Sequence, residues 1–278
     1  MDFTNQEDEI VVFADMLGFA ALTEENHLDV AGLVSGERIL ALDLEGILQR
    51  RKNPLNVAFS SFHFAVRSQI ELASMSGSVT AITFSDSVFF ATKDLEAALR
   101  FASELTFSLL SQGVPVRAGI ASGSFAALRF RSDILKDGGD HATQFLGTAV
   151  VRACKAESCG VKGMRVLIHP SLEPLIEVAI QPDPSIPLDK RAPWLMTELS
   201  QVERANDSRV RYELNYWDLK PGSERAAWHK LQKMWASAPE FAKIHYSSTA
   251  SAIDRMRVQK GEPPIDKLTR RTPPRNRR

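Results

Sequence analysis

Two aspartates stand where apolar strands are expected to end. Asp15 closes the apolar run at 10–14, and Asp86 lies in the short Ser-Asp-Ser link between two β-rich runs. A carboxylate beside a buried strand has to be paired, hydrated or bound to a cation. If the two strands are neighbours, both carboxylates converge. Such a pair suits Mg²⁺, which prefers carboxylates together with substrate phosphates.

The residues that follow Asp15 suit phosphate. Leu17, Gly18 and Phe19 open an expected helix, and the first amides of a helix lack partners within it and favour anions. The chemistry implied is phosphoryl or nucleotidyl transfer with two metal ions. The alternative is structural: Asp15 caps the helix and Asp86 is an ordinary turn residue. The residues alone leave both interpretations open.

The hydrophobic pattern predicts the elements that carry these residues. It favours strands at 10–14, 79–84, 88–92, 164–169 and 209–217, and helices at 36–50, 54–75, 95–113, 147–159 and after Pro170. A hairpin is also expected within 114–130, with Ser122-Gly123-Ser124 as its link. Two more helices are expected beyond Pro221. This order predicts an α+β fold with a mostly antiparallel central sheet flanked by helices.

Composition and charge exclude several classes of protein. The chain has 278 residues, a formal net charge of +0 and 44% hydrophobic residues, which argues against general attraction to nucleic acid or anionic membrane. No apolar run approaches the ~20 residues of a membrane helix. The two cysteines, Cys154 and Cys159, fit reduced thiols. These features predict a cytoplasmic protein with no membrane and no stable nucleic-acid partner.

Four segments resemble, in order, the core motifs of the class III nucleotide cyclase domain. They are FADMLGF (13–19), FSDSVFF (84–90), VRAGIASGSF (116–125) and FLGTAVVRACKAE (145–157). The resemblance implies that Asp15, Asp86 and the carbonyl of Met16 hold two metal ions, Mg²⁺ or Mn²⁺. It also implies a head-to-tail homodimer with its active sites between the chains. In that family the ribose 3′-hydroxyl attacks the α-phosphorus and pyrophosphate leaves.

The helix after Gly147 departs from the family pattern. Family members carry an asparagine and an arginine four residues apart, and the corresponding positions here are Val151 and Lys155. Lysine supplies the charge but not a bidentate fork. Arg152, one turn before Lys155, could share the catalytic role. The alternative is that Lys155 and Arg152 belong to a solvated helix face.

The two positions that read the base also depart from the family. Adenylate cyclases place lysine and aspartate there and guanylate cyclases glutamate and typically cysteine, whereas this chain has Ile82 and Gln144. The chain thereby resembles the stand-alone Pycsar pyrimidine cyclases, which make cyclic UMP or cyclic CMP on phage infection and activate a separate effector protein. The resemblance implies UTP as the favoured substrate and CTP as the alternative. A purine cyclase and an inactive nucleotide-binding module, the latter favoured by Val151, stay open.

The organisation expected along the chain has three parts. Residues 1–220 form the cyclase-like catalytic domain, 221–260 a helical extension and 261–278 a basic, disordered tail. Trp228 and Trp235 lie on one face of the extension, which suits core or dimer-interface packing. Arg117, within an expected strand, is interpreted as part of a structural ion pair rather than a phosphate ligand.

Overall fold

The computed structural model describes residues 2–26, 53–75, 77–131, 140–180, 196–201, 203, 209–217 and 222–265. The helix expected at 36–50 and the tail beyond residue 265 lie outside the described residues.

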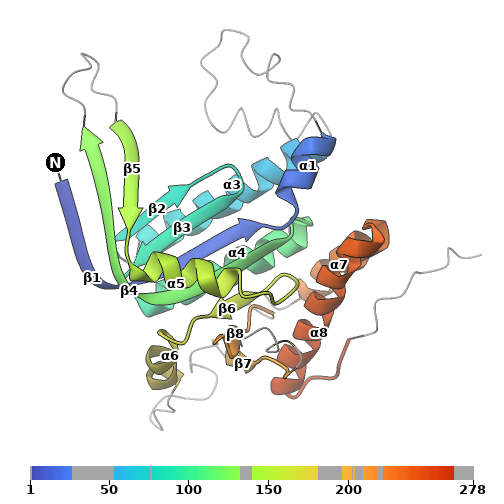
Figure 1. The fold of residues 1–278 in the computed structure, drawn as a ribbon. Coiled ribbons are helices and arrows are strands. Elements are labelled where there is room, and N and C mark those ends of the chain that lie inside the picture. Colours follow the sequence, from blue (N-terminus) through green and yellow to red (C-terminus); the bar gives the residue numbers. More distant parts are fainter. Residues whose placement is uncertain are drawn as a thin grey trace, which may run out of the picture.

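An eight-stranded sheet runs through the middle of the molecule (Figure 1). The order of its strands is β2 (Val79–Thr83), β3 (Ser87–Thr92), β1 (Asp2–Met16), β4 (Val116–Arg131), β6 (Val166–Ile168), β8 (Tyr212–Leu214) and β7 (Met196–Glu198), and β5 (Asp140–Leu146) pairs with β4. Within the described residues only the β4–β6 pairing is parallel. The expected α+β fold with a mostly antiparallel sheet is confirmed.

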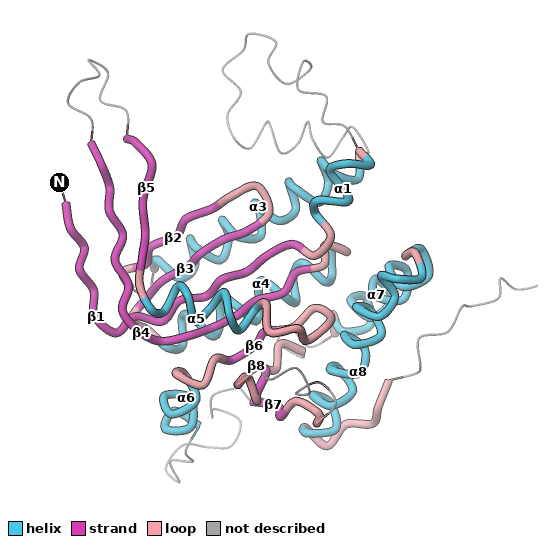
Figure 2. Tube along the Cα trace, viewed as in Figure 1, coloured by secondary structure: helices cyan, strands magenta, loops and turns pink. Residues whose placement is uncertain are grey.

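Helices cover both faces of this sheet (Figure 2). The helices α3 (Pro54–Ser74) and α4 (Leu95–Gln112) lie on one face, and α5 (Thr148–Glu157) lies on the other. The short helices α1 (Phe19–Glu25) and α6 (Glu173–Ile180) follow β1 and β6. Side chains alternate along β1, so Val12 and Ala14 join the core beneath α3 and α4, whereas Val11 and Phe13 pack beside α5. Asp15 follows this alternation onto the α5 face.

The helical extension is packed into the main core. It consists of α7 (Glu224–Ser237), the 3₁₀ turn η2 (Glu240–Ala242) and α8 (Lys243–Gln259). Trp228 of α7 and Met256 of α8 belong to the same buried cluster as α4 and the sheet. Trp228 therefore packs in the core, whereas Trp235 is half-buried beneath the ammonium group of Lys243, 5.3 Å from the ring centre.

The hairpin link expected at Ser122-Gly123-Ser124 is wrong, because β4 runs through it without turning. Pairing with β1 shifts register here, between Gln6 and Glu9, and Gly123 takes a φ of 153°. A Cβ on Gly123 would lie 2.4 Å from Thr148 Oγ1, so only glycine fits beneath α5. A β-bulge and a turn use the same small residues, which explains the error.

Beyond this bulge the strands leave the main sheet. The first part of β1, the second half of β4 and β5 project together as an arm (Figure 1). The hairpin of this region joins β4 to β5, with Ala126 opposite Leu146. Strand β1 accordingly begins at Asp2 rather than at Ile10 as the apolar run indicated.

Candidate active site

Strands β1 and β3 bring Asp15 and Asp86 to adjacent positions at one end of the sheet. Asp15 lies opposite Ser87 in the β1–β3 register, and the amide of Met16 donates to the carbonyl of Asp86 over 2.8 Å. Asp86 occupies the tight link between β2 and β3, where Ser85 Oγ donates to its Oδ1 over 3.1 Å. The two carboxylates therefore come from neighbouring strand ends.

The surroundings of Asp15 disfavour its negative charge. Burial raises the pKa of Asp15 to about 7, the carboxylates of Glu157 and Asp86 add to this rise, and the guanidinium of Arg117 opposes it only in part. Asp15 does not cap α1, because the N-cap of that helix is Gly18. The interpretation of Asp15 as a helix cap is therefore wrong, and its carboxylate lies at a place short of positive charge.

Arg117 forms an ion pair with a third carboxylate, that of Glu157. Arg117 lies opposite Asp15 on β4, and its Nε donates to Glu157 Oε1 over 2.7 Å, while Nη1 donates to the carbonyl of Val161 over 3.1 Å. The expected structural ion pair is confirmed. Glu157 is 6% exposed, so this pair is largely removed from water.

Sequence reasoning missed Glu157. A signal was present, because Val150, Cys154 and Glu157 are spaced i, i+4, i+7 and share one face of α5. That face lies toward β1: Cys154 and Phe13 pack against the same apolar cluster, and Asp15 contributes to the raised pKa of the Cys154 thiol after burial and Glu157. Both Cys154 and Cys159 are free thiols.

The loop after Asp15 offers fewer amides than expected. The amide of Leu17 donates to the carbonyl of Pro115 over 2.9 Å, so it is not available to phosphate and that assignment needs correction. Gly18 has a left-handed φ of 78° and opens α1, leaving the amides of Gly18 and Phe19 at the start of the helix. The Met16 side chain is buried in the core on the opposite face, so Met16 can offer only its main chain.

The two basic residues of α5 have different surroundings. The Arg152 guanidinium is half-buried and its Nη1 donates to the carbonyl of Ser122 over 2.8 Å, so Arg152 supports the bulge of β4. Lys155 is exposed, as is Val151, which is 54% exposed. In the part of the chain that the structure describes, no hydrogen bond or ion pair joins Lys155 or Arg152 to Asp15 or Asp86.

The residues at the base-reading positions lie beside an aromatic cluster. Phe89 stacks on Phe13 with ring centres 4.5 Å apart and contacts Phe145 at 4.7 Å. Ile82 packs against this cluster from β2. Gln144 is exposed on β5 next to Phe145, and successive strand residues point to opposite sides. The structure therefore places Ile82 on the apolar surface formed around Phe89, and Gln144 away from Phe145.

Helix α3 supports the link that carries Asp86. His63 Nε2 lies 3.2 Å from the carbonyl of Ser85, and the His63 ring packs against Phe59 and Phe62 of the same helix. Sequence reasoning did not find this contact, because a histidine on a helix with aromatic neighbours has no distinctive spacing.

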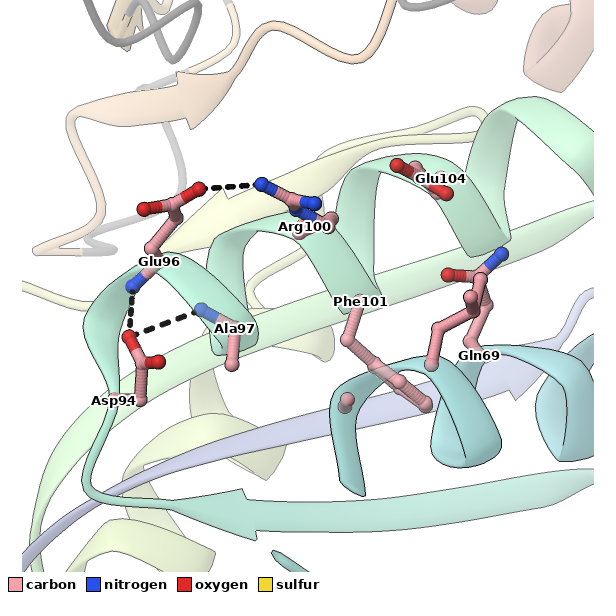
Figure 3. Close-up of a pocket in the computed structure, with 9 residues that line it drawn as sticks. Gln69, Asp94, Glu96, Ala97, Arg100, Phe101 and Glu104 are labelled. Carbon is pink, nitrogen blue, oxygen red and sulfur yellow. Dashed lines mark hydrogen bonds and ion pairs between the residues drawn. The ribbon is translucent and has the colours of Figure 1, made fainter. Parts of the chain in front are cut away.

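A hollow of about 380 Å³ lies elsewhere, between α3 and α4 (Figure 3). Two of its three carboxylates are used locally: Asp94 caps α4 by accepting from the amides of Glu96 and Ala97, and Glu96 pairs with Arg100. Neither Asp15 nor Asp86 lines it. This hollow is therefore not part of the acidic site.

The acidic pair fits a divalent cation that also binds substrate. A cation would relieve the charge that raises the pKa of Asp15, and carboxylate oxygens are the ligands that Mg²⁺ prefers. Within the described ranges, no group of three histidine, cysteine or acidic side chains is arranged to hold a metal by itself. Water, main-chain carbonyls or the oxygens of a phosphate substrate would complete the coordination.

No protein-family model matches the sequence, and no curated protein matches it. Several solved structures are similar. The guanylyl cyclase domain of the RhoGC fusion protein from the aquatic fungus Blastocladiella emersonii is 14% identical, with 77% of this chain and 96% of that chain covered and a TM-score of 0.46. The adenylyl cyclase CyaB from P. aeruginosa is 16% identical, with the same two shares covered and a TM-score of 0.40.

A third similar structure contains a bound nucleotide. The guanylate cyclase domain of RhGC from Catenaria anguillulae, in complex with GTP, is 14% identical, with 76% of this chain and 96% of that chain covered and a TM-score of 0.44. Separately, no helix among the described residues has the length and apolar character needed to cross a bilayer.

Proposed function

We propose that this chain is a class III nucleotide cyclase that converts a pyrimidine nucleoside triphosphate into its 3′,5′-cyclic monophosphate and pyrophosphate. The observation that carries the proposal is the pair Asp15 and Asp86, on adjoining strand ends, with the pKa of Asp15 raised to about 7. A carboxylate pair short of positive charge suits metal ions and the triphosphate that accompanies them.

Each residue has a definite part in this proposal. Asp15, Asp86 and the main-chain carbonyl of Met16 would hold two Mg²⁺ or Mn²⁺ ions, which when bound polarise the phosphates and favour ionisation of the attacking hydroxyl. The amides of Gly18 and Phe19 would orient the phosphate oxygens. The carboxylate of Asp15 is kept in place by the β1–β3 and β1–β4 pairings on either side of it.

Lys155 would serve the site of a second chain. It is exposed on α5 and has no described contact with the acidic pair of its own chain, so its charge is free to stabilise the transition state across a homodimer. Arg152, whose guanidinium is bonded to the carbonyl of Ser122, would act as a positioning residue for α5 rather than contact substrate.

The substrate proposed is UTP, with CTP as the alternative. Ile82 offers no hydrogen bond to a base edge and packs on the phenylalanine cluster, so the purine-reading pattern is missing there. Gln144 is exposed and has both a donor and an acceptor for a base, although it points away from Phe145 and so does not share a surface with Ile82 within one chain. Following the Pycsar resemblance, the cyclic nucleotide would be a cytoplasmic second messenger in anti-phage defence, acting on a separate effector protein.

A second candidate is a cyclase-like module that binds nucleotide without turning it over. It is favoured by Val151, which is exposed where the family has an asparagine. A purine cyclase is the third outcome that an assay would detect.

The deciding experiment is to incubate the purified chain with each of ATP, GTP, CTP and UTP plus Mn²⁺ and to identify products by mass spectrometry. Cyclic UMP or cyclic CMP as the main product is expected. Cyclic AMP or cyclic GMP would overturn the pyrimidine assignment and keep the cyclase. Binding of triphosphate with no cyclic product would favour the inactive module.

The matched variants are Asp86→Asn and Glu24→Gln. Asp86→Asn is expected to lower turnover at least about 10³-fold, because one of two metal-binding carboxylates is lost. Glu24 is exposed on α1, and Glu24→Gln should leave turnover unchanged. Retained cyclase activity in purified Asp86→Asn would contradict the metal assignment.

A further inference from the structure

A second pocket lies directly behind the loop that follows Asp15. Leu17 and Gly18 form one wall, and Pro115 and Met164 continue it from the sheet side. The Leu17 amide is bonded to the Pro115 carbonyl over 2.9 Å, so this wall is a fixed part of the fold. Leu17 and Gly18 therefore connect the pocket to the loop that follows Asp15.

The helical extension supplies the other wall. Ala242, at the end of η2, and His245 and Tyr246, on the first turn of α8, face Leu17 and Gly18 across the pocket. Phe241 stands at the same wall with 82% of its surface exposed. The pocket thus exists only because the extension packs against the catalytic loop.

The lining is apolar and uncharged. His245 Nδ1 accepts the amide of Gly163 over 3.4 Å, which leaves the ring proton on Nε2 in the neutral tautomer. Burial, together with the charges of Lys162 and Arg117, lowers the pKa of His245. Burial likewise raises the pKa of Tyr246, so its hydroxyl stays neutral. The pocket thus offers apolar walls with a hydrogen-bond donor at His245 and a hydroxyl at Tyr246.

The size of the pocket suits one aromatic ring. Its volume is about 180 Å³, and an apolar protein cavity of about 150 Å³ accommodates benzene. A charged ligand would lose its hydration without gaining an opposite charge. A flat apolar ring would bury the exposed face of Phe241 as well as the pocket wall.

We propose that this pocket binds a neutral small molecule built on one aromatic ring that carries a hydrogen-bond acceptor, and that the bound ring acts on the loop Leu17–Gly18. Binding itself is independent of the proposed cyclase function. The effect on turnover rests on that function, because the same loop would hold the triphosphate.

The test uses 4-fluorophenol, followed by fluorine NMR with the full-length protein. Saturable binding is expected, with a Kd on the order of 0.1–1 mM for a ligand of this size. Ala242→Phe, which fills the pocket, should abolish this binding. The control is Ser247→Phe, at a residue exposed on α8 and outside the pocket, and it should bind as the unmodified protein does. Circular dichroism would confirm that both variants are folded.

Two further experiments distinguish binding in the pocket from its effect on the loop. His245→Phe keeps a ring and removes the donor, so the Kd should rise about 2- to 10-fold. In the cyclase assay 4-fluorophenol should change the KM for triphosphate, and Ala242→Phe should be insensitive to it. No saturable binding, or equal binding to Ala242→Phe, would overturn the pocket. Binding without an effect on an active enzyme would overturn only the coupling to the loop.

Discussion

At the scale of single residues, the protonation of Asp15 dominates the chemistry of the site. In the absence of a cation its pKa is raised to about 7 by burial and then by Glu157 and Asp86. Near neutral pH, without metal, a large part of the protein therefore carries a protonated Asp15. A divalent cation would stabilise the ionised form, because it supplies the positive charge that Arg117 gives to Glu157.

This protonation predicts a pH-dependent stability. The folded protein holds a proton on Asp15 between its ordinary pKa and about 7, so the folded state binds more protons than the unfolded one and stability falls as pH rises through this window. Asp15→Asn should remove this fall in stability with rising pH. With EDTA at pH 8, Asp15→Asn should be more stable by about 1–2 kcal/mol, a value discounted for solvent screening.

Urea unfolding at pH 5 and pH 8 would measure the effect. Mg²⁺ should restore stability to the unmodified protein at pH 8 and should do less for Asp15→Asn. Equal pH profiles for the two proteins would show that the folded state does not retain the proton.

At the scale of elements, the position of α5 depends on one glycine of β4. A Cβ on Gly119 would lie 2.1 Å from the carbonyl oxygen of Ala153 and 2.6 Å from the amide of Glu157. Both are backbone atoms of α5, which cannot rotate away as a side chain could. The close approach of helix and strand also sets where Glu157 meets Arg117.

Gly119→Ala is accordingly expected to lower the free energy of unfolding by about 3 kcal/mol, because α5 must move away from the sheet. The matched control is Gly77→Ala, since a Cβ there meets nothing within 4 Å and should change stability by less than about 0.5 kcal/mol. Equilibrium unfolding in urea measures both. Similar values for the two variants would mean that α5 is not held this closely.

A buried charge network ties the extension to the sheet. Arg165 and Glu213 have fully buried side chains and are paired, Arg165 Nη1 lies 2.7 Å from Glu203 Oε1, and Arg255 of α8 lies 3.2 Å from Glu213 Oε1. Burial alone would raise the pKa of Glu203, but the charge and hydrogen bond of Arg165 lower it to about 2. The network therefore holds α8 against β6 and β8.

Glu213→Met should lower the free energy of unfolding by about 3–5 kcal/mol, because Arg165 would keep a buried charge without its principal partner. The double variant Arg165→Met/Glu213→Met should cost at least about 1 kcal/mol less than the sum of the single variants. Urea unfolding of all three proteins gives the coupling energy. Additive losses would show that the pair is not coupled.

At the scale of the whole molecule, one sheet face is only partly covered. Helix α5 packs over β4 and β1, while the side of β2 and β3 presents Phe84, 45% exposed, beside the phenylalanine cluster. Leu146 and Val151 add exposed apolar surface near α5. A second chain placed over this face would cover apolar surface, and in the proposed homodimer its exposed Lys155 would act at the acidic pair.

Complementation would test such a composite site. Asp86→Asn and Lys155→Ala chains should each be nearly inactive alone if every site uses Asp86 of one chain and Lys155 of the other. Random pairing makes half of the dimers mixed, and each mixed dimer has one intact site of two, so an equal mixture should recover about a quarter of full activity. Recovery near zero would mean that both residues act within one chain.

Local sequence patterns predict the two aspartates near strand ends and most of the elements. The convergence of the two carboxylates requires β1 to pair with β3, which the sequence leaves as a condition. The apolar runs and the placement of Asp15 and Asp86 near strand ends follow from local periodicity. Gly113, with a left-handed φ of 85°, ends α4 where the pattern indicated. Local rules operate over a few residues, and these features depend on no more than that.

The surroundings of these residues depend on contacts between distant parts of the chain. Ser122-Gly123-Ser124 forms a bend within β4 and not a hairpin turn, because β1 pairs with β4 on both sides of this segment. The pair of Arg117 with Glu157 joins residues 40 positions apart, and Leu17 gives its amide to a carbonyl far along the chain. Charge, burial and close backbone approach depend on what lies nearby in space, and no local pattern contains that information.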